Sequence, residues 1–288
     1  MGNQYLPTRY VEIIQRLAMG IEPMDAASSR RLGFALQVRP DRPAAGGPRI
    51  EAHTSGNYAI RYPIAPNPNA PGHLRIRVFD ADAPTSRTAR DRRRIVPRRL
   101  EIPLLALAEI KTREQAGDTA LMERIRRPAF FPGAAWPLPP GVTALRGRVV
   151  RGGQPMRWAR VIARLGTKTV GHAHGDDRGE FLLLIRFQPD PDLDEIIPNP
   201  LANVRVTVFG PAAAPVPATP DLPLLDPLWD LPVEKLITPE MIAGTGLPTP
   251  ATASLNDTGT IDYTSSVSQD IDFPLGRCLD DKPDFVLT

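Results

Sequence analysis

The sequence has few cysteines, few aromatic residues and no long apolar run, and each shortage excludes a class of protein. Cys278 is the single cysteine in 288 residues, which excludes an intrachain disulfide framework and a multi-cysteine metal site. Aromatic side chains make up 6%, a low share for a cleft that stacks on sugars. No stretch approaches the roughly 20 apolar residues that a membrane-spanning helix requires. Residues 1–10 lack the pattern of a signal peptide, so we expect assembly in the cytoplasm, even if a finished particle is released later.

Proline, in contrast, is abundant. The chain has 34 prolines, about 12% against a usual share of roughly 5%. A mainly helical bundle is excluded, because proline inside a helix costs about 3 kcal/mol or more. Short alternating segments between proline-rich loops are typical of strands, so the sequence predicts an all-β fold of two modest domains.

Charge is distributed unevenly along the chain. Residues 1–187 carry 31 basic and 16 acidic side chains, and residues 188–288 carry 4 and 16, so the two parts have net charges of +15 and −12. Three interpretations stay open. They are a compositional bias toward arginine, an anionic partner for the basic part, and docking between oppositely charged surfaces in an assembly.

The densest basic segment is 87–99, which holds seven arginines. No aromatic residue interleaves them, which disfavours single-stranded nucleic acid, and no helix-turn-helix or zinc module accompanies them. We therefore expect a solvated loop or a protein-docking patch here rather than a nucleic-acid partner, and contact with duplex phosphates stays open as the alternative. The arginines assigned to the patch are Arg92, Arg93, Arg94, Arg98 and Arg99.

Two tandem Greek-key β-sandwich domains with long proline-rich loops are expected. Apolar residues at helical spacing within 5–19 predict one short helix, and residues 104–127 are expected to be partly helical. The expected parts are an N-terminal helical segment (1–24), a first sandwich (25–131), a proline-rich linker (132–141) and a second sandwich (142–288) with a proline-rich insertion at about 211–260. The expected strands are 31–39, 50–53, 58–62, 74–79, 98–104, 143–150, 158–165, 168–173, 180–186, 203–209 and 267–275.

A degenerate repeat of three strands supports the two domains. In each copy, a turn glycine stands two residues before the aromatic residue that opens a strand. An alternating strand that ends on Phe follows, and the last strand ends in Pro-Leu, as suits an edge or terminating strand. The copies are 55–60, 74–79 and 99–104 in the first half, and 178–183, 203–209 and 269–275 in the second.

The second half also carries a family pattern. It has a G-x-V at 147–149, a G-x-P turn at 153–155, an A-x-V at 159–161 and a D-x-x-G-x-F at 176–181. In these residues, the stretch from Leu145 to Ile185 resembles a carboxypeptidase regulatory-like domain, which is a transthyretin-like β-sandwich. The resemblance covers about 40 of the 288 residues. It implies a structural or interaction module and no catalysis.

A looser resemblance concerns the whole chain. The V-P-R-R-L-E-I-P-L phrase at 96–104, a Trp-Pro linker, this domain and D-P-L-W-D-L-P at 226–232 resemble accessory proteins of phage-tail-like contractile injection systems. That resemblance implies a non-enzymatic structural or adaptor subunit at the cap or the baseplate. Its partners would be sheath, tube, cap or baseplate proteins, with a homo-oligomer as a further option. The alternative is a β-sandwich module that binds carbohydrate or a surface ligand.

Residues with metal-binding or nucleophilic chemistry do not form a predicted site. His172 and His174 share one strand face, but zinc needs a third and usually a fourth ligand, so we expect two exposed histidines beside a turn. Residues 176–180 offer too few oxygens for calcium. The carboxylates of 190–195 predict a solvated loop, and Cys278, with no nearby histidine, predicts an idle thiol. No catalytic residue, metal or cofactor is predicted.

The apolar segment 222–236 is interrupted by prolines, so it can form neither a long helix nor a central strand. It must therefore lie along another surface. One interpretation is that it covers its own second domain, and the other is that it docks on a neighbouring subunit as an extended arm with Trp229 as the anchor. The docking residues assigned to this arm are Leu225, Leu228, Trp229 and Leu231.

Overall fold

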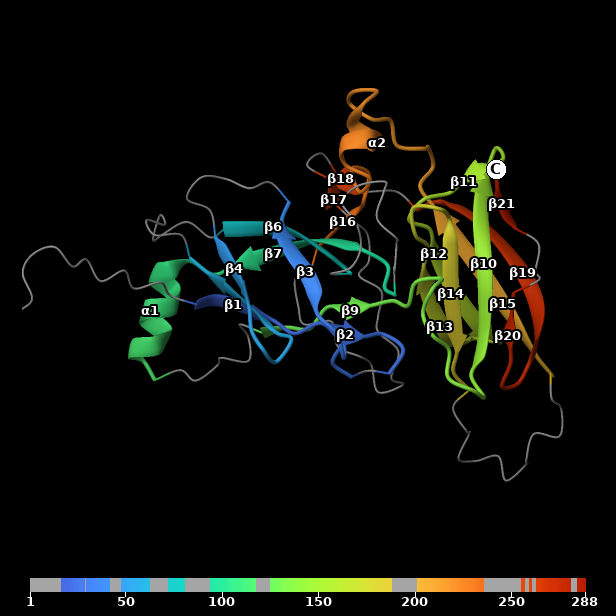
Figure 1. The fold of residues 1–288 in the computed structure, drawn as a ribbon, viewed down its shortest axis with the longest axis horizontal. Coiled ribbons are helices and arrows are strands. Elements are labelled where there is room, and N and C mark those ends of the chain that lie inside the picture. Colours follow the sequence, from blue (N-terminus) through green and yellow to red (C-terminus); the bar gives the residue numbers. More distant parts are fainter. Residues whose placement is uncertain are drawn as a thin grey trace, which may run out of the picture.

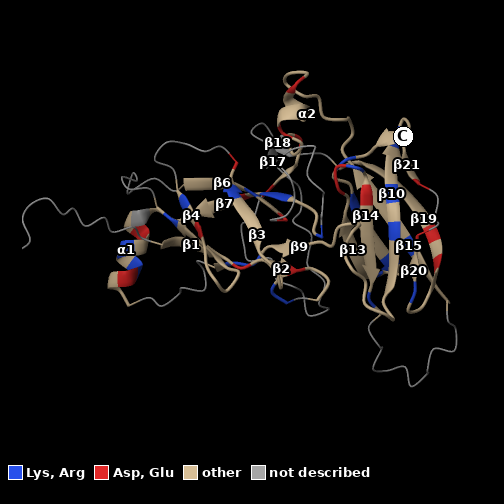
Figure 2. Ribbon diagram, in the orientation of Figure 1, with Lys and Arg blue, Asp and Glu red and all other residues tan. Residues whose placement is uncertain are grey.

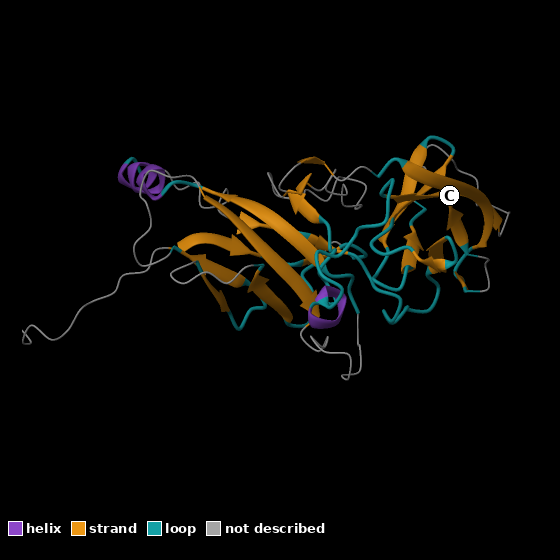
Figure 3. Cartoon of the chain, turned by 90° about the horizontal axis from the view of Figure 1, so that it is seen from above, coloured by secondary structure: helices purple, strands orange, loops and turns teal. Residues whose placement is uncertain are grey.

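The protein consists mostly of β-strands. In a computed structural model, strands account for 52% and helices for 6% of the described residues, which confirms the all-β class. The strands gather in two units that lie end to end and are joined by loops (Figures 1 and 3). The structure describes residues 17–28, 30–41, 48–62, 72–80, 94–117, 125–187, 201–235, 255–256, 259–260, 263–280 and 284–288.

Two four-stranded sheets form the first unit. Its strands are β1 (Leu17–Ile21), β3 (Leu36–Pro40), β4 (Arg49–Ala52), β5 (Tyr58–Arg61), β6 (Gly72–Asp80), β7 (Arg98–Leu104), β8 (Ile125–Arg126) and β16 (Val233–Lys235). One sheet has the order β4-β5-β1-β8, in which β1 pairs antiparallel with β5 and parallel with β8. The other has the order β16-β7-β6-β3, so a strand from late in the sequence forms its edge.

The second unit also has two sheets. Its strands are β10 (Thr143–Arg151), β11 (Gln154–Pro155), β12 (Arg160–Leu165), β13 (Lys168–His174), β14 (Glu180–Ile185), β15 (Leu201–Gly210), β19 (Ser265–Pro274), β20 (Cys278–Leu279) and β21 (Phe285–Leu287). One sheet places β10 between β11 and β14, with β20 and β21 parallel to β10. The other has the order β13-β12-β15-β19.

A few short elements complete the structure. The small strands β2 (Met24–Asp25) and β9 (Ala129–Phe130) pair in parallel, and β17 (Leu255–Asn256) pairs antiparallel with β18 (Gly259–Thr260). Helix α1 (Leu107–Gln115) lies within the segment expected to be partly helical, and α2 (Leu222–Leu225) is a single turn.

The two units repeat one strand arrangement. In the first, β1 pairs antiparallel with β5 and parallel with the short strand β8; in the second, β10 pairs antiparallel with β14 and parallel with β20 and β21. In the facing sheets, the series β3-β6-β7 corresponds to β12-β15-β19. The three strands of each sequence repeat therefore take equivalent places, with the first in one sheet and the other two paired in the facing sheet.

The register of the paired strands extends this equivalence. Arg75 lies opposite Glu101 across β6 and β7, and Arg205 lies opposite Asp270 across β15 and β19. Both are ion pairs, at 2.6 and 2.9 Å. The repeated Pro-Leu ends do not follow this register, because Pro103 stands two residues beyond Glu101 and Pro274 stands four beyond Asp270.

Each unit encloses its own hydrophobic core. In β6, Ile76 and Val78 are fully buried while Arg75 and Arg77 alternate outward, as the sequence pattern predicts. The first core also contains Ile60, Leu100, Ile102 and Phe130. The second core contains Phe181, Leu183, Val204, Val206, Phe273 and Phe285.

Three expectations about the organisation differ from the structure. Residues 17–19, the end of the predicted helix, belong to β1, because a strand directs both Met19 and Ile21 into the core; the rest of the helix lies outside the described residues. The strand expected at 31–39 begins only at Leu36. Finally, β16 was assigned to the second domain by its position in the sequence, but it completes a sheet of the first.

Candidate functional site: the junction of the two units

The segment 226–235, here named the clasp, joins the two units. It follows α2 and ends in β16, where Val233 lies beside Arg99 in a parallel pairing with β7. The segment that the sequence places along an unknown surface thus lies along the first unit of its own chain. The clasp is therefore an intramolecular element, and the residues that hold it define the junction.

A buried ion triad fixes the clasp to both units. Glu234 accepts a hydrogen bond from Arg98 of β7 at 2.6 Å and another from Arg160 of β12 at 3.0 Å. The side chains of Arg98 and Glu234 are only 1% and 3% exposed. Burial by itself raises the pKa of Glu234, but the charges of Arg98 and Arg160 outweigh it, so the pKa lies below its ordinary value. One ionised carboxylate thus binds a cation from each unit.

Asp230 makes a second buried contact with the second unit. Its carboxylate accepts two hydrogen bonds of 2.6 Å from Arg157 and one of 2.9 Å from the indole of Trp158. Trp158 has a φ of 59°, which is rare for a bulky residue and costs of order 1–3 kcal/mol. The Trp158 ring packs with Val96 of the first unit and Leu231 of the clasp. This backbone conformation therefore places an aromatic ring where the three segments meet.

The acidic residues of the clasp are spaced four apart, and each binds arginine from the basic part of the chain. Asp226 accepts a hydrogen bond from Arg77 of β6 at 2.5 Å, just as Asp230 and Glu234 accept hydrogen bonds from arginines. The spacing does not reflect a helix, because β16 is extended and Pro227 interrupts the segment. Figure 2 shows basic and acidic residues on both units rather than one sign on each. Part of the charge asymmetry is therefore neutralised inside the chain.

The junction also contains a buried histidine. His174, at the end of β13, is 1% exposed and stacks on Phe131 with 3.8 Å between ring centroids. Neither ring nitrogen has a hydrogen-bond partner among the described residues. Burial, followed by the charges of Arg160, Arg98 and His172, places its pKa well below 6.5. The expected exposed histidine is wrong at this position, because Phe131 of the first unit covers the end of β13.

The predicted docking arm divides into two parts. Leu231 is 3% exposed and packs in the junction with Leu228 beside it, and Trp229 is half-buried. Leu224 and Leu225 of α2, in contrast, are 49% and 78% exposed. Figure 1 shows α2 on a loop that projects from the body of the molecule. We name residues 211–225 the tip. The expected docking role of Leu231 is wrong, because its side chain is enclosed by its own chain.

The predicted arginine patch does not form as one surface. Arg98 is fully buried in the ion triad and donates a further hydrogen bond to the carbonyl of Ala129 at 2.6 Å, so it is not available to a partner. Arg92 and Arg93 lie outside the described residues. The remaining two, Arg94 and Arg99, bind the carboxylates of Asp80 and Asp41.

Other residues with binding chemistry do not gather into a metal site in the part of the chain that the structure describes. The pKa of His172 falls to about 4, first through burial and then through the charge of Arg164. Asp176 accepts backbone hydrogen bonds from Arg178 and Glu180 at 2.8 and 3.0 Å, which is ordinary turn chemistry. The carboxylates of 190–195 lie outside the described residues.

Sequence reasoning missed most of the residues that build the junction. Glu234, Asp230 and Trp158 were not singled out as a group. The four-residue spacing of Asp226, Asp230 and Glu234 in an acidic region was a usable signal. No signal identified their arginine partners, because Arg98 and the other arginines stand among the 31 basic residues of 1–187. Only the fold selects which arginine meets which carboxylate.

No helix within the described residues is long and apolar enough to cross a membrane. No protein-family model, curated protein or solved structure matches this chain. Its function must therefore be inferred from its own geometry and from the motifs in its sequence.

Proposed function

We propose that the protein is a non-enzymatic structural or adaptor subunit of a phage-tail-like contractile injection particle, in its cap or baseplate region. The observation that carries the proposal is the junction. A buried clasp fixes two β units in one arrangement, which suits a part that sets the spacing of its neighbours. The junction requires three ionic contacts and a strained Trp158, and a flexible tandem would need none of them.

The motifs behind the looser resemblance support the same proposal. The phrase at 96–104 includes β7, and the phrase at 226–232 lies in the clasp. Val96 of the first phrase packs with Leu231 of the second, and Arg98 binds Glu234 just beyond it. The two phrases, distant in sequence, thus belong to one structural feature.

At the level of fold, we propose that each unit is a Greek-key β-sandwich and that the second is of the transthyretin-like type. The repeated strand arrangement supports this, as does the resemblance of residues 145–185, which span β10 to β14. The tip would then be the part that docks on sheath, tube, cap or baseplate proteins. Its support is the exposure of three apolar residues on a proline-rich loop, Val216, Leu224 and Leu225.

The test combines light scattering after size exclusion with co-sedimentation of the tagged chain with particles from the native source. We expect the wild type to sediment with particles and Leu225→Asp to stay in solution. Val286→Asp is the matched control, because Val286 is also exposed, at 55%, but lies in β21. A monodisperse chain that never joins particles would overturn the adaptor role. Equal sedimentation of Leu225→Asp would overturn the role of the tip.

A second candidate function is the binding of a carbohydrate or another surface ligand. The observation in its favour is a cavity of about 480 Å³ in the first unit, with a polar rim that includes His53, Ser55 and Asn57. A glycan-array screen of the isolated chain would test this candidate. Binding of a defined glycan, lost on filling the cavity by Ala59→Leu, would favour it over the adaptor role.

A further inference from the structure

The cavity of the first unit arises from two small residues in its sheet. Gly20 of β1 lies opposite Ala59 of β5, and Ile125 of β8 lies beside Gly20 on the other side. Neither glycine nor alanine fills the space above the sheet, so a hollow remains between Leu17 and Ile125. Its volume of about 480 Å³ falls within the usual range of small-ligand sites.

Apolar groups line much of this cavity. Leu17, Ile21, Ala59 and Ile125 all contribute to its wall. Leu17 is 37% exposed, so this large apolar side chain is in contact with solvent. An apolar ligand in the cavity would remove Leu17 from water, which is favourable because apolar surface is buried.

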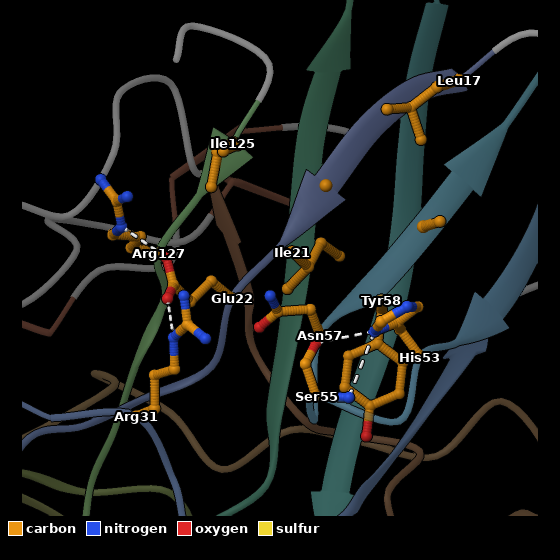
Figure 4. Close-up of a pocket in the computed structure, with 12 residues that line it drawn as sticks. Leu17, Ile21, Glu22, Arg31, His53, Ser55, Asn57, Tyr58, Ile125 and Arg127 are labelled. Carbon is orange, nitrogen blue, oxygen red and sulfur yellow. Dashed lines mark hydrogen bonds and ion pairs between the residues drawn. The ribbon is translucent and has the colours of Figure 1, made fainter. Parts of the chain in front are cut away.

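A charged group stands at one side of the cavity (Figure 4). Glu22, whose side chain is 8% exposed, accepts hydrogen bonds from the Nε atoms of Arg31 and Arg127, the second at 2.7 Å. Burial alone raises the pKa of Glu22, but the two guanidiniums lower it by more. The pKa therefore lies below its ordinary value, and the carboxyl is ionised. Two cations around one anion leave a net positive charge. The carboxylate also holds both guanidiniums in place through their Nε atoms.

The second unit carries a cavity at the equivalent place. It lies over β10 and β14, the counterparts of β1 and β5, and has a volume of about 530 Å³. Its lining differs, because it includes charged residues of both signs instead of a large apolar wall. These are Arg146, Arg148, Glu180, Asp280 and Asp284. The repeat has thus kept the hollow in both units, and only the first combines an apolar wall with an excess of arginine.

We propose that the cavity of the first unit binds a ligand with an aliphatic body and a carboxylate. The aliphatic part would lie against Leu17, Ala59 and Ile125, and the carboxylate would accept hydrogen bonds from the Nη groups of Arg31 and Arg127. Guanidinium groups match a carboxylate in geometry and charge, and charge-assisted hydrogen bonds are the stronger kind. The site needs no partner protein and is independent of the adaptor role.

Octanoate is the probe for the test, titrated into the full chain by calorimetry or by NMR chemical shifts. We expect saturable binding to the wild type, about tenfold or more weaker binding to Arg127→Gln, and none to Ala59→Leu, whose larger side chain fills the hollow. Arg148→Gln, which removes an arginine from the equivalent cavity, is the matched control and should bind octanoate like the wild type. Octylammonium, with the charge reversed, should not bind.

Two outcomes would overturn the proposal. One is an absence of octanoate binding in a chain that is folded by circular dichroism. The other is a lack of charge selectivity, seen as equal octanoate affinity of the wild type and Arg127→Gln together with equal affinity of the wild type for octanoate and octylammonium. If Arg127→Gln is poorly folded, Arg31→Gln replaces it, because the Arg31 side chain is 58% exposed and its loss disturbs no core.

The same chemistry has two sources, a free aliphatic acid and the carboxyl end of a polypeptide. A short peptide that ends in leucine, with its C-terminal amide as the comparison, distinguishes them. Tighter binding of the acid peptide than of octanoate, lost in the amide, would assign the site to a chain end. Octanoate binding with neither peptide bound would assign it to a free acid. Both results retain the aliphatic carboxylate as the ligand class.

Discussion

Arg98 and Glu234 are 136 residues apart in the sequence, and their side chains meet at 2.6 Å in the interior of the molecule. Both residues make further contacts: Arg98 also donates to the Ala129 carbonyl, and Glu234 also accepts a hydrogen bond from Arg160. The pair therefore links β7, β9, β12 and the clasp. Removing the Glu234 side chain therefore deprives both Arg98 and Arg160 of their shared carboxylate in an enclosed site.

The first prediction concerns Glu234. Replacing it by alanine should lower the free energy of unfolding by about 3–5 kcal/mol, because a buried ion pair that loses one partner leaves the other charge uncompensated. Urea unfolding followed by circular dichroism measures the change. The matched control is Asp270→Asn, which breaks the exposed Arg205–Asp270 pair at the equivalent edge of the second unit. The control should unfold like the wild type, and equal stability of both variants would contradict the role of the triad.

The second prediction concerns Asp230 and the arrangement of the units. Asp230→Ala should loosen the junction, because Arg157 and the Trp158 indole lose their shared acceptor. Both hydrophobic cores lie away from this contact and should stay folded. Small-angle X-ray scattering should show a larger radius of gyration with unchanged circular dichroism. An unchanged scattering curve would mean that β16 and Glu234 hold the units without Asp230.

The third prediction concerns pH. His174 has a pKa well below 6.5 in the folded chain, so the unfolded chain binds more protons at pH values below about 6.5. Stability therefore falls as the pH drops through 6.5, by about 1.4 kcal/mol for each unit until the folded pKa is reached. His172, with a pKa of about 4, adds a similar loss of stability as the pH falls from 6.5 toward 4.

Urea unfolding at pH 7.5 and pH 5 of the wild type, His174→Phe and His172→Gln measures this dependence. In each variant, the free energy of unfolding should fall less between pH 7.5 and pH 5 than it does in the wild type. Glu234 acts in a different window, because a lowered carboxyl pKa contributes stability that is lost only as the pH falls below about 4.5. Equal pH profiles for the wild type and His174→Phe would contradict the burial of a neutral imidazole at the junction.

The fourth prediction concerns Gly147 in β10. A methyl group at this position would stand 2.4 Å from the ring of Phe181, which is fully buried in the core. Gly147→Ala should therefore destabilise the second unit by about 1–3 kcal/mol through overpacking. Thermal unfolding measures the effect. Gly33→Ala is the control, because nothing lies within 4 Å of its added methyl group; a similar loss in both variants would contradict the packing argument.

The sequence predicts the strands better than their assembly. Alternation places β6 and β15 correctly, because apolar residues at every second position have only one face to bury. β1 was missed, since the spacing of Ile14 and Leu17 also fits a helix and only pairing with β5 settles the choice at Leu17. The path of the clasp could not be predicted, because its side-chain contacts with the two units join residues 70 to 149 positions apart.

At the candidate site, too, the sequence indicates single residues but not the contacts that they make. The apolar residues of 222–231 predict a segment that lies along a surface, and in the structure Leu228 and Leu231 pack at the junction while Leu225 is exposed. The surface they meet depends on Trp158, whose positive φ no sequence pattern indicates. Similarly, His174 was seen as a strand residue, but its burial depends on Phe131, which belongs to the other unit.

The position of β16 has a consequence for synthesis of the chain. The β7 edge of the first unit is complete only after residue 235 has left the ribosome, more than 130 residues after β7 itself. At about 5–20 residues per second, the nascent first unit exposes an unpaired strand edge and the Arg98 cation for on the order of ten seconds. During that time the β7 edge is open to chaperones and to neighbouring nascent chains. The order of synthesis thus leaves this edge, which is covered in the finished protein, open to incorrect pairing until β16 is made.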